Sequence, residues 1–221
     1  MNAARLLHLL QFASPALPIG GYSYSQGLEA AIDEGSVHDA MSAHAWLVRY
    51  LDEVMARWDG PLLWRLMKAF EARDLAGVAE WSACFLASRD TAELRAETVQ
   101  MGYSLTRLIA ELGVADVGPL GDEVSLPAAY ACAVDALDIP HEDALLAMLF
   151  SWVENQVLVC VKSVPLGQVA GQRLLLSLRP DLERTAATAC TLPDADLSNW
   201  SPGLSMLSMR HEVQHGRLYR S

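Results

Sequence analysis

The stretch LRAETVQMGYSLTRLIAEL, residues 94–112, carries the pattern that decides the fold. Its apolar positions recur three or four residues apart, which places them on one face of an α-helix of about five turns. Gly102 lies in the middle of this helix, where it costs about 1 kcal/mol relative to alanine. We therefore predict that a neighbouring backbone approaches the helix closely at Gly102. The positions on the predicted face are Leu94, Thr98, Met101, Leu105, Leu108, Ile109 and Leu112.

The same helical period recurs along most of the chain, whereas strand-like alternation is almost absent. A second clear example runs from Leu47 to Trp58, and Asp59-Gly60-Pro61 then predicts a break before the next helix. A last helix is predicted from Ser201-Pro202, where serine supplies the N-cap and proline the first position. These patterns predict an all-α fold, a single globular helical domain of about eight to ten helices over residues 1–221. Further predicted helices cover 61–72, 75–86, 126–137, 141–164 and 166–178.

The bulk composition indicates protein partners. The apolar share is 52%, slightly above the roughly 45–50% typical of soluble domains, so we expect apolar surface left over for an interface. A formal net charge of -11 argues against binding to nucleic acid or to an acidic membrane surface, because both require clustered Lys and Arg. No segment offers about 18 unbroken apolar residues, so no membrane span is predicted.

The cysteines indicate a reducing compartment. Four of them are widely scattered and form no C-x-x-C pair, which is typical of free thiols rather than of a disulfide framework or a zinc ribbon. We therefore expect a cytoplasmic protein. The four are Cys84, Cys132, Cys160 and Cys190.

The segment SPALPIGGYSYSQGLEAA, residues 14–31, has features that helix packing alone does not explain. Its prolines and glycines predict a rigid loop, and Ser23 with Gln26 predicts a capping box for a helix that ends at Gly35. Tyr22 and Tyr24 lie in this loop, and large amphipathic rings on a rigid loop are typical of protein contact sites. The alternative is that both rings are buried over a helix end. A serine hydrolase is not indicated, because the G-x-S-x-G pattern is absent.

The sequence HEVQH, residues 211–215, matches the H-E-x-x-H pattern of zinc peptidases. Histidines at i and i+4 share one helical face and can bind one Zn²⁺, while the glutamate between them activates water. Such a site needs a third ligand, and the extended pattern would require Gly at 218 and His at 221, where this chain has Leu218 and Ser221. We favour structural or interface roles for His211 and His215. A zinc metallopeptidase and a nickel-binding chaperone that uses these two histidines are the alternatives.

Four segments, read together, resemble the urease accessory protein F (UreF) family. They are SPALPIGGYSYSQGLE near the start, RAETVQMGYSLTRL in the middle, VKSVPLGQVAGQRLL later and MRHEVQHGRLYRS at the end. They occur in the family's order and span nearly the whole chain. The first and the last are the specific ones, and His215 is a departure, because the family does not require a histidine there.

The resemblance implies an all-helical homodimer with no active site and no cofactor of its own. It implies docking to the accessory protein of the D type, called H in some systems, and recruitment of the G-type GTPase. The resulting complex would deliver Ni²⁺ to apo-urease in a GTP-dependent step, and the family member would also modulate the GTPase. The segments 1–25 and 202–221 are the expected docking elements.

The resemblance also carries individual residues. Within the terminal signature the matching positions include His211, Glu212 and Arg217, and Tyr22 and Arg217 match positions that help to hold both ends of the chain against the D-type partner. The loop and the tail are therefore expected to lie together. We predict a partner interface at Tyr22, Tyr24, Ser25, Glu29, Lys162, His211, Arg217 and Tyr219.

Overall fold

The computed structural model describes residues 2–221, and within this range the chain forms helices, turns and loops but no β-strand. Because α3, the π-helix η2 and α4 follow one another without a break, residues 2–221 form ten continuous helices longer than one turn, and the predicted all-α domain is confirmed. The helices are α1 (Ala3–Phe12), α2 (Leu28–Asp33), α3 (Ala40–Tyr50), η2 (Leu51–Asp59), α4 (Gly60–Glu71), α5 (Leu75–Ala87), α6 (Ala92–Glu111), α7 (Leu126–Ala136), α8 (His141–Ser163), α9 (Gln168–Ser177), α10 (Arg179–Thr191) and α11 (Pro202–Glu212). One-turn 3₁₀ segments cover Gly21–Ser23 (η1), Gly118–Leu120 (η3) and Asp194–Asp196 (η4).

The predicted break at Asp59-Gly60-Pro61 is wrong, because the helix continues through these residues. Pro61 has no N–H group to donate to the carbonyl of Arg57, four residues back, and a proline inside an α-helix normally breaks the helix. Here the π-helical segment η2 precedes it: the Gly60 N–H bonds to the carbonyl of Met55, five residues back. The Arg57 carbonyl accepts instead from the N–H of Ser198, at 3.2 Å.

The predicted close approach at Gly102 is confirmed. A Cβ atom added to this residue would lie 2.1 Å from the carbonyl oxygen of Val124 and 2.7 Å from the carbonyl carbon of Ser125. Ser125 is the N-cap of α7 and accepts from the N–H of Ala128 at 3.3 Å. The glycine therefore lets the start of α7 lie directly on α6.

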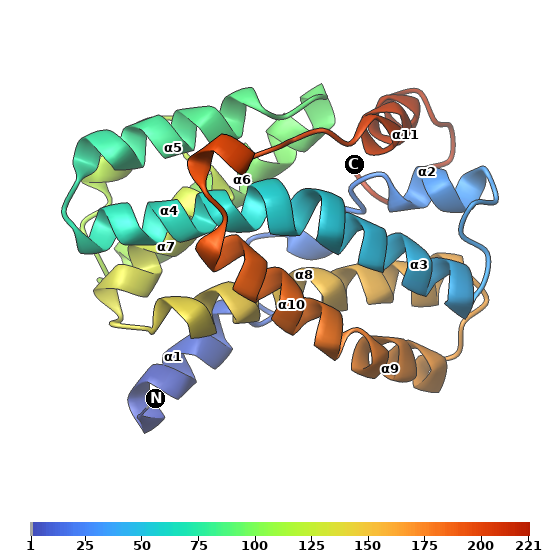
Figure 1. The fold of residues 1–221 in the computed structure, drawn as a ribbon, viewed down its shortest axis with the longest axis horizontal. Coiled ribbons are helices and arrows are strands. Elements are labelled where there is room, and N and C mark those ends of the chain that lie inside the picture. The colour runs from blue at the N-terminus through green and yellow to red at the C-terminus, as the bar shows by residue number, and fades with distance from the viewer. Residues whose placement is uncertain (1) are drawn as a thin grey trace.

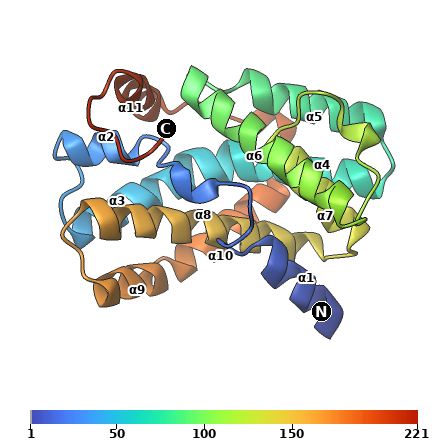
Figure 2. The ribbon, with the colours of Figure 1, turned by 180° about the vertical axis from the view of Figure 1, so that it is seen from behind.

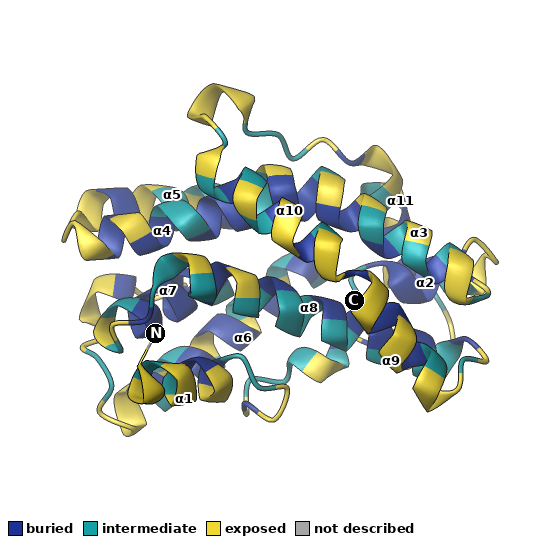
Figure 3. Ribbon diagram, turned by 60° about the horizontal axis from the view of Figure 1, so that its bottom comes forward, coloured by how far each residue is buried: buried dark blue, intermediate teal, exposed yellow. Residues whose placement is uncertain are grey.

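Helix α8 passes through the middle of the bundle and packs against α1, α2, α3, α4, α9 and α10 (Figure 1). By length and composition alone it could cross a membrane, with a mean hydropathy of 1.7. Its packing is that of a core helix instead, and it buries the polar side chain of Gln156. Exposed residues lie on the outward sides of α1, α9 and α10 (Figure 3).

The four cysteines are free, as predicted. Cys132 and Cys160 are buried, and burial raises the pKa of Cys132 to about 11 and that of Cys160 to about 12. These two thiols are therefore core residues and not nucleophiles.

Helix α11 packs against α2 and α6 at one edge of the molecule, and the last residues of the chain return beside α2 (Figures 1 and 2). Helix α1 lies at the opposite end (Figures 1 and 2). The fold thus separates α1 from the C-terminal tail, but it brings the loop after α1 back to that tail.

Candidate functional site

The C-terminal tail lies on the N-terminal loop, and we call residues 20–29 and 211–221 together the loop–tail unit (Figure 2). The Arg220 N–H donates to the carbonyl of Ser23 at 2.8 Å, and the Ser25 N–H donates to the carbonyl of Ser221 at 2.9 Å. From α8, the side-chain amide of Asn155 donates to the carbonyl of Tyr24 at 3.0 Å. The expectation that the loop and the tail lie together is therefore confirmed.

Glu29 on α2 fixes the backbone of the tail. Its side chain is buried, and its carboxylate accepts from the N–H of Leu218 at 2.7 Å and from the N–H of Tyr219 at 3.0 Å. Hydrogen bonds to an ionised acceptor are about twice as strong as neutral ones. One buried carboxylate thus determines the path of two consecutive tail residues.

His211 joins the tail to two helices. It lies in the last turn of α11 with none of its surface exposed, and its Nε2 atom is 3.1 Å from Oε2 of Glu29. Its Nδ1 atom is 2.7 Å from Oε2 of Glu93 on α6, and Glu93 also pairs with Arg217 of the tail. Both nitrogens of the imidazole are therefore occupied within the protein. The result is a buried network that connects α2, α6, α11 and the tail.

The geometry of HEVQH is not that of a zinc site. Helix α11 ends at Glu212, so His215 lies beyond the helix, exposed, and does not share a helical face with His211. The Glu212 carboxylate accepts from the N–H of Ala92 at 3.0 Å, in the first turn of α6, where a negative charge is favoured by the helix dipole. Among residues 2–221 no three His, Cys, Asp or Glu side chains form a group that could hold a metal ion. The motif instead closes the contact between α11 and α6.

A second buried network lies beneath the tail. The Ser221 hydroxyl donates to Oε2 of Glu97 at 2.6 Å, and the Gln26 amide donates to Oε1 of the same carboxylate at 2.5 Å. Burial raises the pKa of Glu97 to about 7, although both of these hydrogen bonds act in the opposite direction. The Gln26 carbonyl in turn accepts from Tyr50 and from Trp152, at 3.0 and 2.6 Å.

The predicted capping box of Ser23 and Gln26 is wrong. Helix α2 begins only at Leu28, after Gly27, and both Gln26 and Gly27 have positive φ angles, of 52° and 83°. The side chain of Gln26 is used in the network around Glu97 and not at the helix end. The two glycines at 20 and 27 supply the left-handed turns that fold the loop toward the tail.

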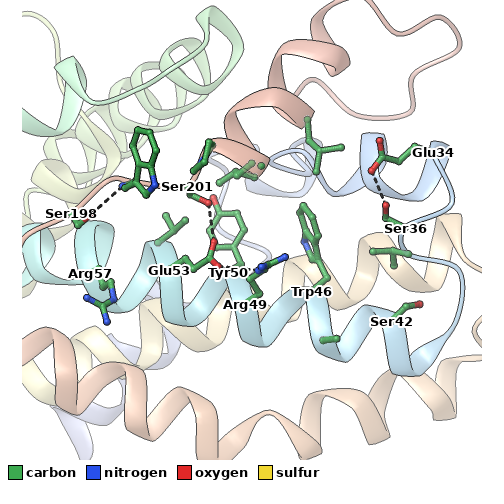
Figure 4. Close-up of a pocket in the computed structure, with 18 residues that line it drawn as sticks. Glu34, Ser36, Ser42, Trp46, Arg49, Tyr50, Glu53, Arg57, Ser198 and Ser201 are labelled. Atoms are coloured by element: carbon green, nitrogen blue, oxygen red, sulfur yellow. Dashed lines mark hydrogen bonds and ion pairs between the residues drawn. The ribbon is translucent and has the colours of Figure 1, made fainter.

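A groove of about 780 Å³ separates the tail-bearing helix α11 from α3 and η2 (Figure 4). The Ser201 hydroxyl donates across it to Oε2 of Glu53 at 3.2 Å, and Glu53 also pairs with Arg49 at 2.9 Å. Arg210, on α11, pairs with Glu34 at the end of α2. Helix α11 is thus joined to η2 through Ser201 and to the end of α2 through Arg210, and it packs against α2 and α6.

Comparison with known proteins identifies the family of this chain. The UreF family model matches residues 37–179, more than half of the chain. The chain belongs to the UreF family. It is 62% identical to "Urease accessory protein UreF" of Janthinobacterium sp. (strain Marseille), with all of both chains covered, and 57% identical to the protein of the same name from Nitrosospira multiformis, over 98% of this chain and 97% of that one. It is also 47% identical, over its whole length, to 53% of "Bifunctional urease accessory protein UreEF" of Bordetella bronchiseptica.

In this member of the UreF family the eight predicted interface residues gather around the tail, but they differ in exposure. Tyr22 is 63% exposed, and Arg217 and Lys162 also reach the surface. The Nζ atom of Lys162, on α8, lies 5.9 Å from the centre of the Tyr219 ring. The other five are buried within the chain: Tyr24, Ser25, Glu29, His211 and Tyr219. Burial also raises the pKa of both Tyr24 and Tyr219.

Sequence reasoning missed three residues that complete this UreF-family site: Gln26, a half-buried residue that bonds to Glu97, Tyr50 and Trp152, and Glu93 and Glu97 on α6. The signal for Glu97 was present, because it lies between Leu94 and Met101 on the apolar face of α6, where an acidic side chain needs a buried partner. No such signal marked Glu93, whose partners His211 and Arg217 are more than a hundred residues away.

Proposed function

We propose that this UreF-family chain is a non-catalytic scaffold for urease maturation. Its loop–tail unit docks the accessory protein of the D or H type, and the docked complex recruits the G-type GTPase for GTP-dependent insertion of nickel into apo-urease. The names of its relatives support the accessory role, and the UreEF name joins two accessory proteins in a single chain. The resemblance adds a homodimer, modulation of the GTPase and the cytoplasm as the location, all of which belong to this proposal.

The observation that carries the docking role is the buried carboxylate of Glu29, which fixes the tail backbone while the side chains of Arg217 and Leu218 are exposed. Leu218 donates its N–H to Glu29 and leaves its side chain 72% exposed. Tyr22, in the loop that pairs with the tail, is 63% exposed. A preorganised surface with exposed tyrosine, leucine and arginine side chains is what a protein-binding site needs, because little ordering entropy is then lost on binding.

The buried and exposed residues then have different roles. Tyr22, Lys162 and Arg217 contact the partner. Glu29 and His211, with the other buried members of the predicted interface, hold the surface in shape. Arg217 contributes to both, because it pairs with Glu93 and donates to the carbonyl of His211 at 3.3 Å.

The test is the affinity for the D- or H-type protein, measured by calorimetry with purified proteins. Tyr22→Ala and Leu218→Ala change exposed side chains outside the buried network, and we expect each to weaken binding by about tenfold or more, as at interface hot spots. Tyr103→Ala is the matched control, since Tyr103 is 56% exposed on α6. Unchanged affinity in both tail and loop variants, or an equal loss with Tyr103→Ala, would contradict the proposed docking site.

A further inference from the structure

The groove between α11 and the continuous α3–η2 helix is a second candidate binding surface. Its volume of about 780 Å³ lies within the range of about 300–1,000 Å³ that is usual for ligand sites. One wall is formed by α3 and η2, and the other by the start of α11 with the preceding residues 198–201. Trp46 rises from α3 into the space between these walls (Figure 4). The groove shares no residue with the loop–tail unit, because its lining residues lie within 34–57 and 198–207.

The interior of the groove is apolar and aromatic. The partly buried Trp46 and Leu204 line it together with the buried Leu207. Trp200 also lines it and has 79% of its surface exposed. Tryptophan buries a large area on binding and is enriched among the residues that dominate binding energy. An exposed tryptophan beside an apolar groove therefore indicates a surface that a partner covers.

The two carboxylates that line the groove are already neutralised. Glu53 pairs with Arg49 at 2.9 Å and accepts from the Ser201 hydroxyl at 3.2 Å. Glu34, at the other end of the groove, pairs with Arg210 of α11. A basic ligand would have to compete with these two arginines for the carboxylates. The groove therefore does not favour a basic ligand.

Hydrogen-bond donors of the groove, in contrast, are free. Within residues 2–221 the exposed Arg57 has no ion-pair partner, and the indole N–H of Trp200 has no acceptor. Ser201 is the N-cap residue of α11, but its hydroxyl donates to Glu53 and caps no N–H group. The first turn of α11, at Gly203, therefore adds uncapped N–H groups to the same wall. A ligand that fits this groove brings hydrogen-bond acceptors and a negative charge, and it needs few donors.

We propose that this groove binds an extended, proline-rich segment of a partner protein that carries an acidic residue. Such a segment has no internal hydrogen bonds, so its carbonyl groups are free to accept, and its prolines present no N–H group that the groove would leave unpaired. The proline rings pack on Trp46 and Trp200, as in other aromatic-lined grooves that bind proline-rich segments. The acidic residue pairs with Arg57. This second docking site goes beyond the proposed function.

The test is a selection of random nine-residue peptides on the immobilised protein, with a parallel selection on Gly203→Phe. A Cβ atom added at Gly203 meets no atom within 4 Å, so the phenylalanine ring has room to enter the groove without displacing its walls. We expect the unchanged protein to enrich peptides that combine proline with aspartate or glutamate, and Gly203→Phe not to enrich them. Urea unfolding of Gly203→Phe shows whether the variant keeps its fold.

Point variants then locate the contact with a fluorescent copy of the most enriched peptide. Arg57→Glu and Trp200→Ala should each weaken binding at least about tenfold in fluorescence polarisation. Arg173→Glu and Tyr103→Ala, at exposed residues of α9 and α6, are the matched controls and should bind as the unchanged protein does.

Three results would overturn the proposal. The first is that no sequence is enriched on the unchanged protein over Gly203→Phe, or that the enriched peptides are basic or lack proline. The second is equal weakening in the groove variants and their controls, which would place the peptide elsewhere. The third is self-association in solution that Gly203→Phe abolishes, because a second copy of this chain would then occupy the groove.

Discussion

Replacing Glu29 by alanine should release the C-terminal tail without unfolding the domain. The carboxylate accepts two hydrogen bonds, from the N–H groups of Leu218 and Tyr219, and its Oε2 atom lies 3.1 Å from Nε2 of His211. Alanine leaves both N–H donors without their acceptor, that of Tyr219 in a buried position, and it leaves the imidazole with Glu93 alone. Because the contacts of Glu29 are concentrated on the tail, the cheapest response is for the tail to detach and hydrate these groups.

The size of the effect follows from the chemistry of the lost contacts. Hydrogen bonds to a charged group contribute about 1.5–3 kcal/mol each, and the tail loses two of them in this variant. We take about 3 kcal/mol as the lower bound, which corresponds to a change of about 100-fold in the opening equilibrium of the tail. Glu34→Ala is the control, since Glu34 forms a surface ion pair with Arg210 that contributes at most about 1 kcal/mol.

Amide hydrogen exchange measures this opening directly. The amides of Leu218 and Tyr219 should exchange at least about 100-fold faster in Glu29→Ala than in the unchanged protein. Amides of α7 should be much less affected, and Glu34→Ala should leave the tail protected. Trypsin should then cut after Arg217 in the Glu29 variant. The same tail protection in Glu29→Ala as in the unchanged protein would refute the reasoning, because the tail would then be held by other contacts.

Three further predictions concern the interior. The pKa of Glu97 is raised to about 7 in the folded chain against a usual value near 4.5, so between these pH values the folded state holds a proton that the unfolded state has lost, and stability falls as pH rises from about 4.5 through about 7. In urea unfolding, the free energy of unfolding of Glu97→Gln should therefore exceed that of the unchanged protein by up to about 3 kcal/mol at pH 8, but by little at pH 4. Gly102→Ala should destabilise the protein by about 1–3 kcal/mol despite alanine's better helix propensity, because the added Cβ atom would meet the backbone of Val124. An unchanged or higher melting temperature would count against the close contact of α6 and α7. Gln26→Ala should lower the free energy of unfolding in urea by about 2–4 kcal/mol, because it leaves the Tyr50 hydroxyl and the Trp152 indole N–H without their acceptor. A decrease below about 0.5 kcal/mol would show that water replaces the amide.

Helical periodicity predicted most of the fold because it reports which face of each segment is apolar. The helix predicted over residues 94–112 appears as α6. A glycine inside a helix costs stability, which implied a close neighbour at Gly102, and the structure places the backbone of Val124 there. The continuation through Pro61 could not be predicted in the same way. It depends on a π-helical turn and on an outside donor, the N–H of Ser198, and neither leaves a periodic signal.

The candidate site was predicted less completely. The family signature selected residues that do gather around the tail, but the pattern could not tell Tyr22, which is exposed, from Tyr24, which is buried two positions later. The contacts among Glu29, Glu93 and His211 join three helices that are far apart in sequence. Such long-range pairing of buried polar groups is fixed by the packing of the whole domain and not by local spacing.

Activation of apo-urease by nickel is the most direct test of the scaffold role. The assay combines apo-urease, the D- or H-type protein, the G-type GTPase, GTP and nickel with this chain or with its Tyr22→Ala/Leu218→Ala variant, and it measures the urease activity formed. We predict that the variant loses activation in parallel with its loss of binding to the D- or H-type protein, whereas Tyr103→Ala and His215→Ala retain both. Full activation by a variant that no longer binds this partner would contradict docking through the loop–tail unit, and loss of activation with His215→Ala would show that HEVQH acts as a metal site after all.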